Sequence, residues 1–269
     1  MGVRSKFGGT SDKVMLLFLK NVLSVKTSTS NLVMIGECGL VPISLISNIN
    51  AISYAIRLRD MSDRMQVKQV FNELRRLHEL GYQNWYSQII SLAESYEVDL
   101  DRIEHNEAKN IKAKIISQYK VNFMEQLKQP NNSRILKMYS DIKTCFKMEN
   151  YLNSIREVRY RVALSRLRCS SHILEVERGR HTRPKTPFVN RLCPICNIPE
   201  DEVHFITQCN LYKCDRKEML DKIERKYPST LTLKDIDLFK FLLQHQDPFV
   251  LNSLGKFTFR ALKSRARIL

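Results

Sequence analysis

Residues 193–209 have the sequence CPICNIPEDEVHFITQC, which places four metal-ligand side chains within 17 residues. Two residues separate Cys193 from Cys196, seven separate Cys196 from His204, and four separate His204 from Cys209. A Cys-x2-Cys turn directs two thiolates at one ion, and side chains five apart on a short helix converge near its end. Three thiolates and one imidazole favour zinc in a closed tetrahedral site, so the expected Zn²⁺ site is structural rather than catalytic.

The alternative is that these cysteines are scattered core residues and the histidine is unrelated to them. This alternative is disfavoured, because four residues of the right ligand types follow one another within a segment that begins with a Cys-Pro-x-Cys turn. The odd total of seven cysteines favours reduced thiols or metal ligands over a disulfide framework. Cys214 is interpreted as a buried helix residue rather than a competing ligand. The acids at 200–202 are interpreted as helix N-terminal acids, with a bond to the imidazole as the alternative. The other cysteines are expected in the apolar core: Cys38, Cys145 and Cys169.

The segment before this motif is strongly basic, with ten basic residues between positions 156 and 191 against three acids. Nine of the ten are arginine, which suits bidentate phosphate contact and stacking on bases. Alternatively, these side chains cover the core with their aliphatic stems or pair with acids. The residues expected to contact nucleic acid are Arg156, Arg159, Arg161, Arg166, Arg168, Arg178, Arg180, Arg183, Lys185 and Arg191.

If this segment is helical, its apolar residues fall on one face and form a stripe of Ile155, Val158, Val162 and Cys169. Two rows of guanidinium groups would then flank the stripe. One row is Arg159 and Arg166, and the other is Arg161 and Arg168.

The rest of the chain has helical periodicity nearly throughout, which predicts a mainly α protein: a multi-helix body, the C-x2-C-x7-H-x4-C knuckle and a helical tail. Apolar spacing predicts that Val14, Leu17, Phe18, Val22 and Leu23 face inward on the first helix. The helix over 64–80 is expected to bury Met65, Val67, Val70, Phe71, Leu74 and Leu77. The other helices are expected at about 30–39, 42–60, 84–96, 99–129, 134–146, 148–171, 212–226, 231–246 and 249–266.

A short strand is expected at 172–177, followed by a basic loop, residues 179–192. These features divide the chain at about 172–192. The expected organisation is a flexible lead-in at 1–13, a helical thumb-like and connecting body at 14–171, the basic loop and zinc knuckle at 172–212, and the helical tail at 213–269.

The net charge of +16 is concentrated in the middle of the chain, where residues 101–200 carry 20 basic and 10 acidic side chains. Such a concentration favours a polyanion-binding surface over solvated helix faces. Glycine-rich phosphate loops are absent from the sequence. Residues 38–56 lack charges, but Pro42 and two asparagines favour a buried helix over a membrane span. With no secretory signal segment, the chain is expected to be intracellular, nuclear or cytoplasmic, without membrane contact.

The order RYRVALSRLRCSSHILEVERGR (159–180), a basic loop, CPIC, EDEVHF and QC resembles the C-terminal region of LINE-type (non-LTR) retrotransposon reverse transcriptases. FLKNVLSVKTSTSNLVMIGECGL (18–40) is similar to the thumb-like segment that follows the polymerase palm in that family. The likeness covers about 14–215, and its cysteines and histidine match the family's zinc positions. It implies that this region helps to hold template RNA and target DNA, with the upstream polymerase region of a full-length element as a partner.

The sequence differs from that family in the residues that carry catalysis. Reverse transcriptases chelate two metal ions with clustered aspartates, but this chain has no Asp-Asp pair. Asp99, Asp101, Asp235 and Asp237 are expected to be helix N-terminal acids. The leading hypothesis is therefore a zinc-stabilised, non-enzymatic fragment that binds RNA or DNA backbone. The alternative is a zinc-stapled protein-interaction or scaffolding module whose arginines meet acidic partners.

Overall fold

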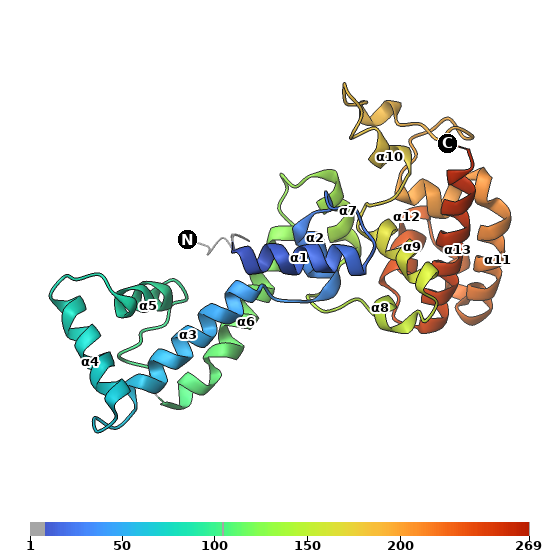
Figure 1. Cartoon of the computed structure of the whole chain (residues 1–269). Coiled ribbons are helices and arrows are strands. Elements are labelled where there is room, and N and C mark those ends of the chain that lie inside the picture. Colours follow the sequence, from blue (N-terminus) through green and yellow to red (C-terminus); the bar gives the residue numbers. More distant parts are fainter. Residues whose placement is uncertain (1–8, 104, 269) are drawn as a thin grey trace. The chain divides into compact units, whose positions relative to one another are not determined.

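The computed structural model describes residues 9–103 and 105–268, without the side chains of residues 105–109. The described part is helical with no strand, which confirms the mainly α class. Contacts divide the chain into two units. Figure 1 labels the helices of both units. Unit 1 comprises Met1–Met15 and Val41–Gln126, and unit 2 comprises Leu16–Leu40 and Leu127–Leu269. The expected boundary at 172–192 does not coincide with this division. Part of the lead-in, residues 1–8, lies outside the described residues, and residues 10–13 belong to the first helix, α1 (Thr10–Val22).

Unit 1 contains α3 (Ile43–Arg59), α4 (Gln66–Glu79), α5 (Trp85–Glu94) and most of α6 (His105–Leu127). Phe71 joins α4 to α5, because its ring lies edge-on to Tyr86 and Trp85 of α5, with centroids 5.3 and 6.4 Å away. A capping box in which Asn84 and Ser87 exchange side-chain and backbone hydrogen bonds starts α5.

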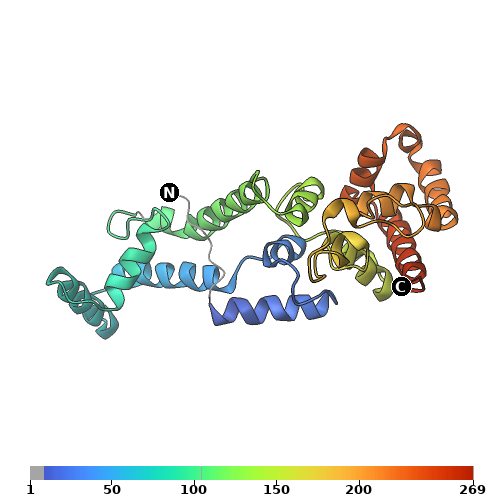
Figure 2. The same ribbon diagram turned by 90° about the horizontal axis from the view of Figure 1, so that it is seen from above.

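Unit 2 contains α2 (Asn31–Cys38), α7 (Arg134–Ile142), α8 (Tyr151–Ser154), α9 (Val158–Arg168) and α10 (Glu175–Arg178). Its C-terminal helices are α11 (Lys213–Lys226), α12 (Asp235–Gln244) and α13 (Pro248–Ala266), which lie together with α9 in Figures 1 and 2. Gly255 lets α13 approach α9 closely, since a Cβ at Gly255 would meet Ile155 and Tyr160 at 3.0 and 3.2 Å.

A group of buried charges joins the N-terminal part of unit 2 to α9. Arg168, 1% exposed, donates to Glu37 at 2.6 Å and pairs with Glu149 at 2.9 Å. Lys143 pairs with Glu149 at 2.6 Å, and the Tyr139 hydroxyl donates to Glu37 at 2.9 Å. Two cations thus compensate two carboxylates in the interior, as buried charges require.

Two expected helix faces are wrong. On α1, Val14, Leu17, Phe18 and Val22 are exposed, while Leu23, like Leu16 and Leu19, is buried. On α4, Met65, Val67 and Val70 are exposed, Leu74 and Leu77 are half-buried, and Phe71 is buried beside Lys68. In both helices the apolar periodicity predicted the helix itself, but a different face of the helix is buried.

The segment expected as one helix over 148–171 is two helices, because Ile155 and Glu157 adopt extended backbone conformations. The strand expected at 172–177 is wrong, since Glu175–Arg178 form a single helical turn. Glu200 replaces a strand partner there: its carboxylate accepts the Glu175 N–H at 2.7 Å and its carbonyl accepts the Val176 N–H at 3.1 Å.

Across the described residues, no single helix is long and apolar enough to cross a membrane. Helices α2 and α3 meet the length and composition test only when they are taken together as a pair with a break between them. Within the charge-free stretch at 38–56, Leu45, Ile49 and Ile52 are buried inside the protein, as expected of a core helix.

Candidate metal centre and basic segment

The knuckle, residues 193–209, begins with a tight turn that aims two sulfur atoms inward. The Cys193 N–H donates to the Ile198 carbonyl at 2.8 Å, and the Asn197 N–H donates to the Cys193 carbonyl at 2.9 Å. Asn197 has φ 54°, a left-handed conformation that asparagine tolerates better than most residues. The Asn210 N–H donates to the Cys196 sulfur at 3.4 Å, so this sulfur is oriented by the backbone that follows the knuckle.

The other two candidate ligands lie on a π-helical turn, His204–Gln208 (η2). The Cys209 N–H donates to the His204 carbonyl at 2.9 Å, which closes an i to i+5 ring and brings both side chains to one side. This turn provides the convergence that the five-residue separation predicts. Arg216 of α11 secures it, with bonds of 2.7 Å to the Ile206 carbonyl and 2.6 Å to the Cys209 carbonyl.

The four side chains meet at one point that a metal ion could fill. Their ligand atoms all lie within 4.8 Å of one another, and the Cys209 sulfur is 3.7 Å from that of Cys193 and 3.9 Å from that of Cys196. Sulfur atoms on a tetrahedron with metal–sulfur bonds of about 2.3 Å are about 3.8 Å apart. The donor spacing therefore fits a single tetrahedral ion.

His204 fits a metal-binding role most directly, because its Nε2 atom is buried and has no hydrogen-bond partner among the described residues. Its Nδ1 atom lies 3.4 Å from the Gln208 side-chain oxygen, and Gln208 donates to Asp235 of α12 at 2.7 Å. Such outer contacts orient the imidazole of a metal-bound histidine. Burial raises the pKa of the Cys209 thiol to about 12, so a cation is needed to hold it as a thiolate.

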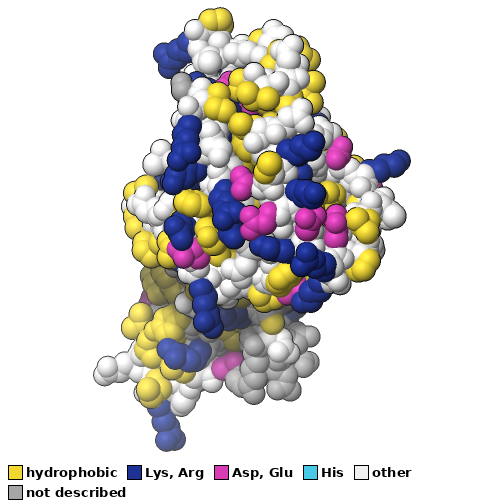
Figure 3. Space-filling model, turned by 90° about the vertical axis from the view of Figure 1, so that its right-hand side faces the viewer, with side chains coloured by type: hydrophobic (Ala, Val, Ile, Leu, Met, Phe, Trp, Pro, Cys, Tyr) yellow, Lys and Arg dark blue, Asp and Glu magenta, His cyan; other side chains and the backbone are white. Residues whose placement is uncertain are grey.

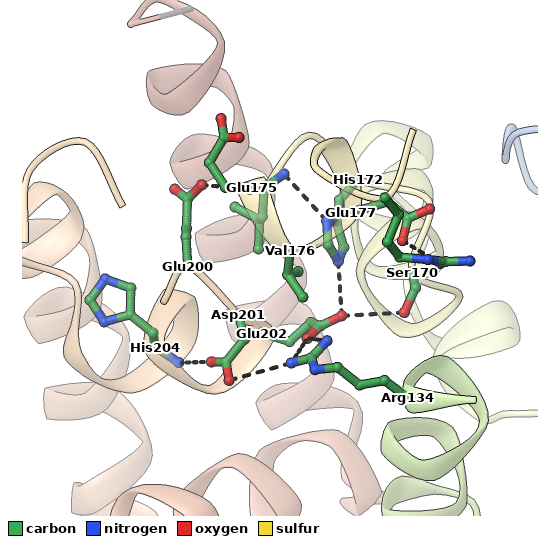
Figure 4. Close-up of polar contacts among 12 residues, drawn as sticks. Arg134, Ser170, His172, Glu175, Val176, Glu177, Glu200, Asp201, Glu202 and His204 are labelled. Atoms are coloured by element: carbon green, nitrogen blue, oxygen red, sulfur yellow. Dashed lines mark hydrogen bonds and ion pairs between the residues drawn. The ribbon is translucent and has the colours of Figure 1, made fainter. Parts of the chain in front are cut away.

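The acids at 200–202 anchor the knuckle to other elements (Figure 4). Glu200 accepts from Arg265 of α13 at 2.7 Å, Asp201 accepts the His204 N–H at 2.9 Å, and Glu202 accepts from His172 at 3.2 Å. The helix N-terminal role is therefore found for Asp201 alone, and these hydrogen bonds do not reach the imidazole of His204.

Glu202 is the most constrained of these acids. Burial opposes its ionisation, but the hydrogen bond and charge of His172 and the charge of Arg134 lower the Glu202 pKa to about 2. Ser170 also donates to it at 3.2 Å. Sequence reasoning missed His172, Arg216 and Arg265 as supports of the centre, because each reaches it from another element.

The ten basic residues between 156 and 191 are in three different environments. Arg168 is in the interior, which contradicts its expected place on an exposed row, and the apolar stripe fails at Val158, which is 57% exposed. Arg161 and Arg191 donate to backbone carbonyls, and Arg180 pairs with Glu177. The six exposed members of the set are Arg156, Arg159, Arg166, Arg178, Arg183 and Lys185.

Among these six, Arg159 and Arg178 have carboxylate partners, Glu157 and Glu175, and Arg166 donates to the Ser24 carbonyl at 2.8 Å. Within the described ranges, no carboxylate lies within 4.0 Å of the other three cations, Arg156, Arg183 and Lys185. These three are free to meet an external anion.

The C-terminal tail offers a more neutral surface. Figure 3 shows Lys and Arg side chains interspersed with Asp and Glu side chains on the side that carries α11. There Glu218 pairs with Lys222, Lys256 and Arg260. Arg265 is 2% exposed, so it contributes no surface charge.

The remaining acids and cysteines have ordinary surroundings. Asp99 caps the turn before α6 by accepting the Asp101 and Arg102 N–H groups, and Asp235 and Asp237 lie in the first turn of α12. Cys38 and Cys169 are buried, whereas Cys145 and Cys214 are exposed, contrary to expectation. Over the described residues, the knuckle is the one group of three or more His, Cys, Asp or Glu side chains able to share a metal ion.

No protein-family model matches this chain, and the chain matches neither a curated protein nor a solved structure. The likeness to LINE-type reverse transcriptases therefore rests on the motif residues alone.

Proposed function

We propose that this chain is a zinc-stabilised helical module that binds the backbone of RNA or DNA. The observation that carries the proposal is that three exposed cations of the basic segment, Arg156, Arg183 and Lys185, have no carboxylate partner in the described structure. The acids of this segment and of the knuckle do not neutralise them, because Glu175 pairs with Arg178, Glu177 with Arg180, Glu200 with Arg265 and Glu202 with His172.

Zinc is the proposed metal because three thiolates and one imidazole are soft and borderline ligands that suit Zn²⁺ in a tetrahedral site. Cys193, Cys196, His204 and Cys209 supply all four positions, which leaves none for a water molecule or substrate. The ion would hold the knuckle together and would not take part in a reaction.

The resemblance to LINE-type retrotransposon proteins supports the same function and adds a context. In that context the chain is the binding end of a longer element, with an upstream polymerase region as its partner. We propose no polymerase or endonuclease activity for this chain, since Asp99 and Asp101 lie in the turn before α6, Asp235 and Asp237 lie in the first turn of α12, and no cluster of three carboxylates able to share a metal ion is found among the described residues.

The test is a salt titration of nucleic-acid affinity for the zinc-loaded protein. Phosphate contacts by the three cations without carboxylate partners would give a slope of log affinity against log salt of about −2 on single strands, with little sequence preference. Absence of affinity at low salt for RNA and DNA of several sequences would refute the proposal. A saturable acidic protein partner with no nucleic-acid affinity would support the scaffolding alternative instead.

A further inference from the structure

The basic loop carries an exposed aromatic ring, Phe188, three and five residues along the chain from its two unpaired cations, Lys185 and Arg183. Phe188 is 38% exposed, and Val189 next to it is 67% exposed. The guanidinium carbon of Arg134 lies 4.8 Å from the centroid of the Phe188 ring, within the range of a cation–π contact. The ring is therefore supported by a cation and is still accessible to solvent.

Arg134 is itself held firmly. Its guanidinium donates to Glu202 at 3.2 Å and pairs with Asp201 at 3.3 Å, and both acids belong to the knuckle. Because Glu202 is 2% exposed and is also bonded to His172, the support under Phe188 is fixed by the metal-centre segment.

The base of the loop is also closed. Arg191 donates to the Thr186 carbonyl at 2.9 Å and to the Val176 carbonyl at 2.7 Å, while the Thr186 N–H donates to the Gly179 carbonyl at 3.0 Å. Arg183 and Lys185 lie inside this closed segment with exposed side chains. The loop thus presents two cations and one aromatic ring from a backbone tied at its base.

A surface with both cations and an exposed aromatic ring is expected to bind single strands more tightly than duplexes. Cations alone serve any phosphate backbone, but an exposed ring gains from a base only when the face of that base is free. Bases in a duplex are stacked on their neighbours, whereas bases of a single strand can stack on a protein ring.

We propose that the basic loop and Arg134 form a binding surface for single-stranded nucleic acid. A base stacks on Phe188, and phosphates contact Arg183 and Lys185. This inference rests on the proposed nucleic-acid-binding function and specifies its ligand.

The experiment measures fluorescence anisotropy of the zinc-loaded protein with a labelled mixed-sequence oligonucleotide, presented as single-stranded RNA, single-stranded DNA and duplex DNA. Phe188→Ala is expected to weaken single-strand affinity by about fivefold or more, the loss seen when a stacking ring is removed. Duplex affinity should stay within about twofold of wild type, because phosphate contacts remain. Val189→Ala is the matched control: it removes a more exposed apolar side chain that has no aromatic face, and should change neither affinity.

The cations are tested separately. The double variant Arg183→Ala, Lys185→Ala should reduce the magnitude of the single-strand salt slope by about 1.4, which corresponds to two phosphate contacts. The double variant Lys217→Ala, Arg225→Ala removes the same charge from exposed positions on α11 and should leave the slope unchanged. Phe188→Leu keeps the apolar volume without the aromatic face and serves if the alanine variant fails to fold.

A loss of affinity for single-stranded RNA or single-stranded DNA in Phe188→Ala supports the inference. The strand whose affinity falls identifies which type of nucleic acid the loop binds. Wild-type single-strand affinity in a folded, zinc-loaded Phe188 variant would overturn the inference and leave the proposed function standing. Equal losses for single strands and duplex would overturn it as well. A wild-type protein without any nucleic-acid affinity would overturn both.

Discussion

Arg168 holds its charge in the interior of unit 2 between Glu37 and Glu149, and it also donates to the Leu243 carbonyl. Removing one partner of a buried ion pair leaves the other charge without compensation, which costs about 3–5 kcal/mol. Arg168→Ala should lower the free energy of unfolding by this amount, as measured by urea denaturation. Arg156→Ala is the control, because Arg156 is exposed and has no carboxylate within 4.0 Å among the described residues. Wild-type stability of Arg168→Ala would contradict the buried role.

Gly39 ends α2 in the left-handed conformation, with φ 60°. A Cβ at this position would clash with the backbone of Lys147 and Met148, which is unable to move aside as a flexible side chain could. Gly39→Ala should therefore destabilise the protein by about 2 kcal/mol or more, since the conformation alone costs an L-residue about 1–2 kcal/mol. Gly81 offers a comparison: its φ is 90°, but a Cβ there meets nothing within 4 Å.

Gly81→Ala carries the conformational cost without the clash and should destabilise the protein less than Gly39→Ala. Chemical denaturation of both variants measures the difference. Equal losses would show that the contact with Met148 does not matter.

At the scale of elements, Glu218 links α11 to α13 by accepting from Arg260 at 2.6 Å and from Lys256 at 3.2 Å. Hydrogen bonds from Lys222, Arg260 and Lys256 lower the Glu218 pKa to about 2. A carboxyl whose pKa is lower in the folded protein stabilises it fully above the unfolded pKa of about 4.5, and this stabilisation is lost as the pH falls toward 2.

Glu218→Gln should remove that part of the acid sensitivity, so its stability should decline less than that of wild type between about pH 4.5 and pH 2. Thermal unfolding of both proteins across this range measures the effect. Asp221→Asn, which changes an exposed acid on the same helix, should follow the wild-type profile. A Glu218→Gln profile parallel to wild type would show that the link does not contribute.

Periodicity predicted most helices, but not which face each one buries. In α4 the stripe of Val67 and Val70 follows helical spacing, yet α3 and α5 contact the side that carries Phe71. Spacing within one helix contains no information about the position of its neighbours. The predicted strand at 172–177 failed for the same reason, because a carboxylate 25 residues away, Glu200, caps the turn at Glu175.

At the scale of the whole molecule, the four residues of the candidate metal centre could be predicted to lie together, because all four belong to one short segment whose local turns bring them close. The supports of the centre could not be predicted, because they come from distant positions. Arg134 and Arg265 lie 68 and 65 residues away from the acids that they hold, Glu202 and Glu200. Both arginines look like surface cations in the sequence.

These supports determine what metal removal should do. The knuckle acids bind α7 through Arg134 and α13 through Arg265, while His172 holds Glu202 from the segment after α9. A structural zinc site contributes on the order of 10 kcal/mol to local folding, so its loss should release these contacts. Chelation should therefore speed amide hydrogen exchange in residues 193–209. It should also speed exchange in α10, whose Glu175 and Val176 N–H groups donate to Glu200, and at the end of α13, where Arg265 donates to the same acid.

The helices α3, α4 and α5 provide the internal control, since the contacts of the knuckle described above all lie within unit 2. Their exchange should be unchanged by chelation. Cys193→Ser should lower the zinc content and reproduce the exchange pattern of the chelated protein, whereas Cys214→Ser, which changes an exposed thiol outside the cluster, should match wild type in both. A folded sample without bound metal, or faster exchange confined to residues 193–209, would show that the acids do not connect the metal centre to the helices.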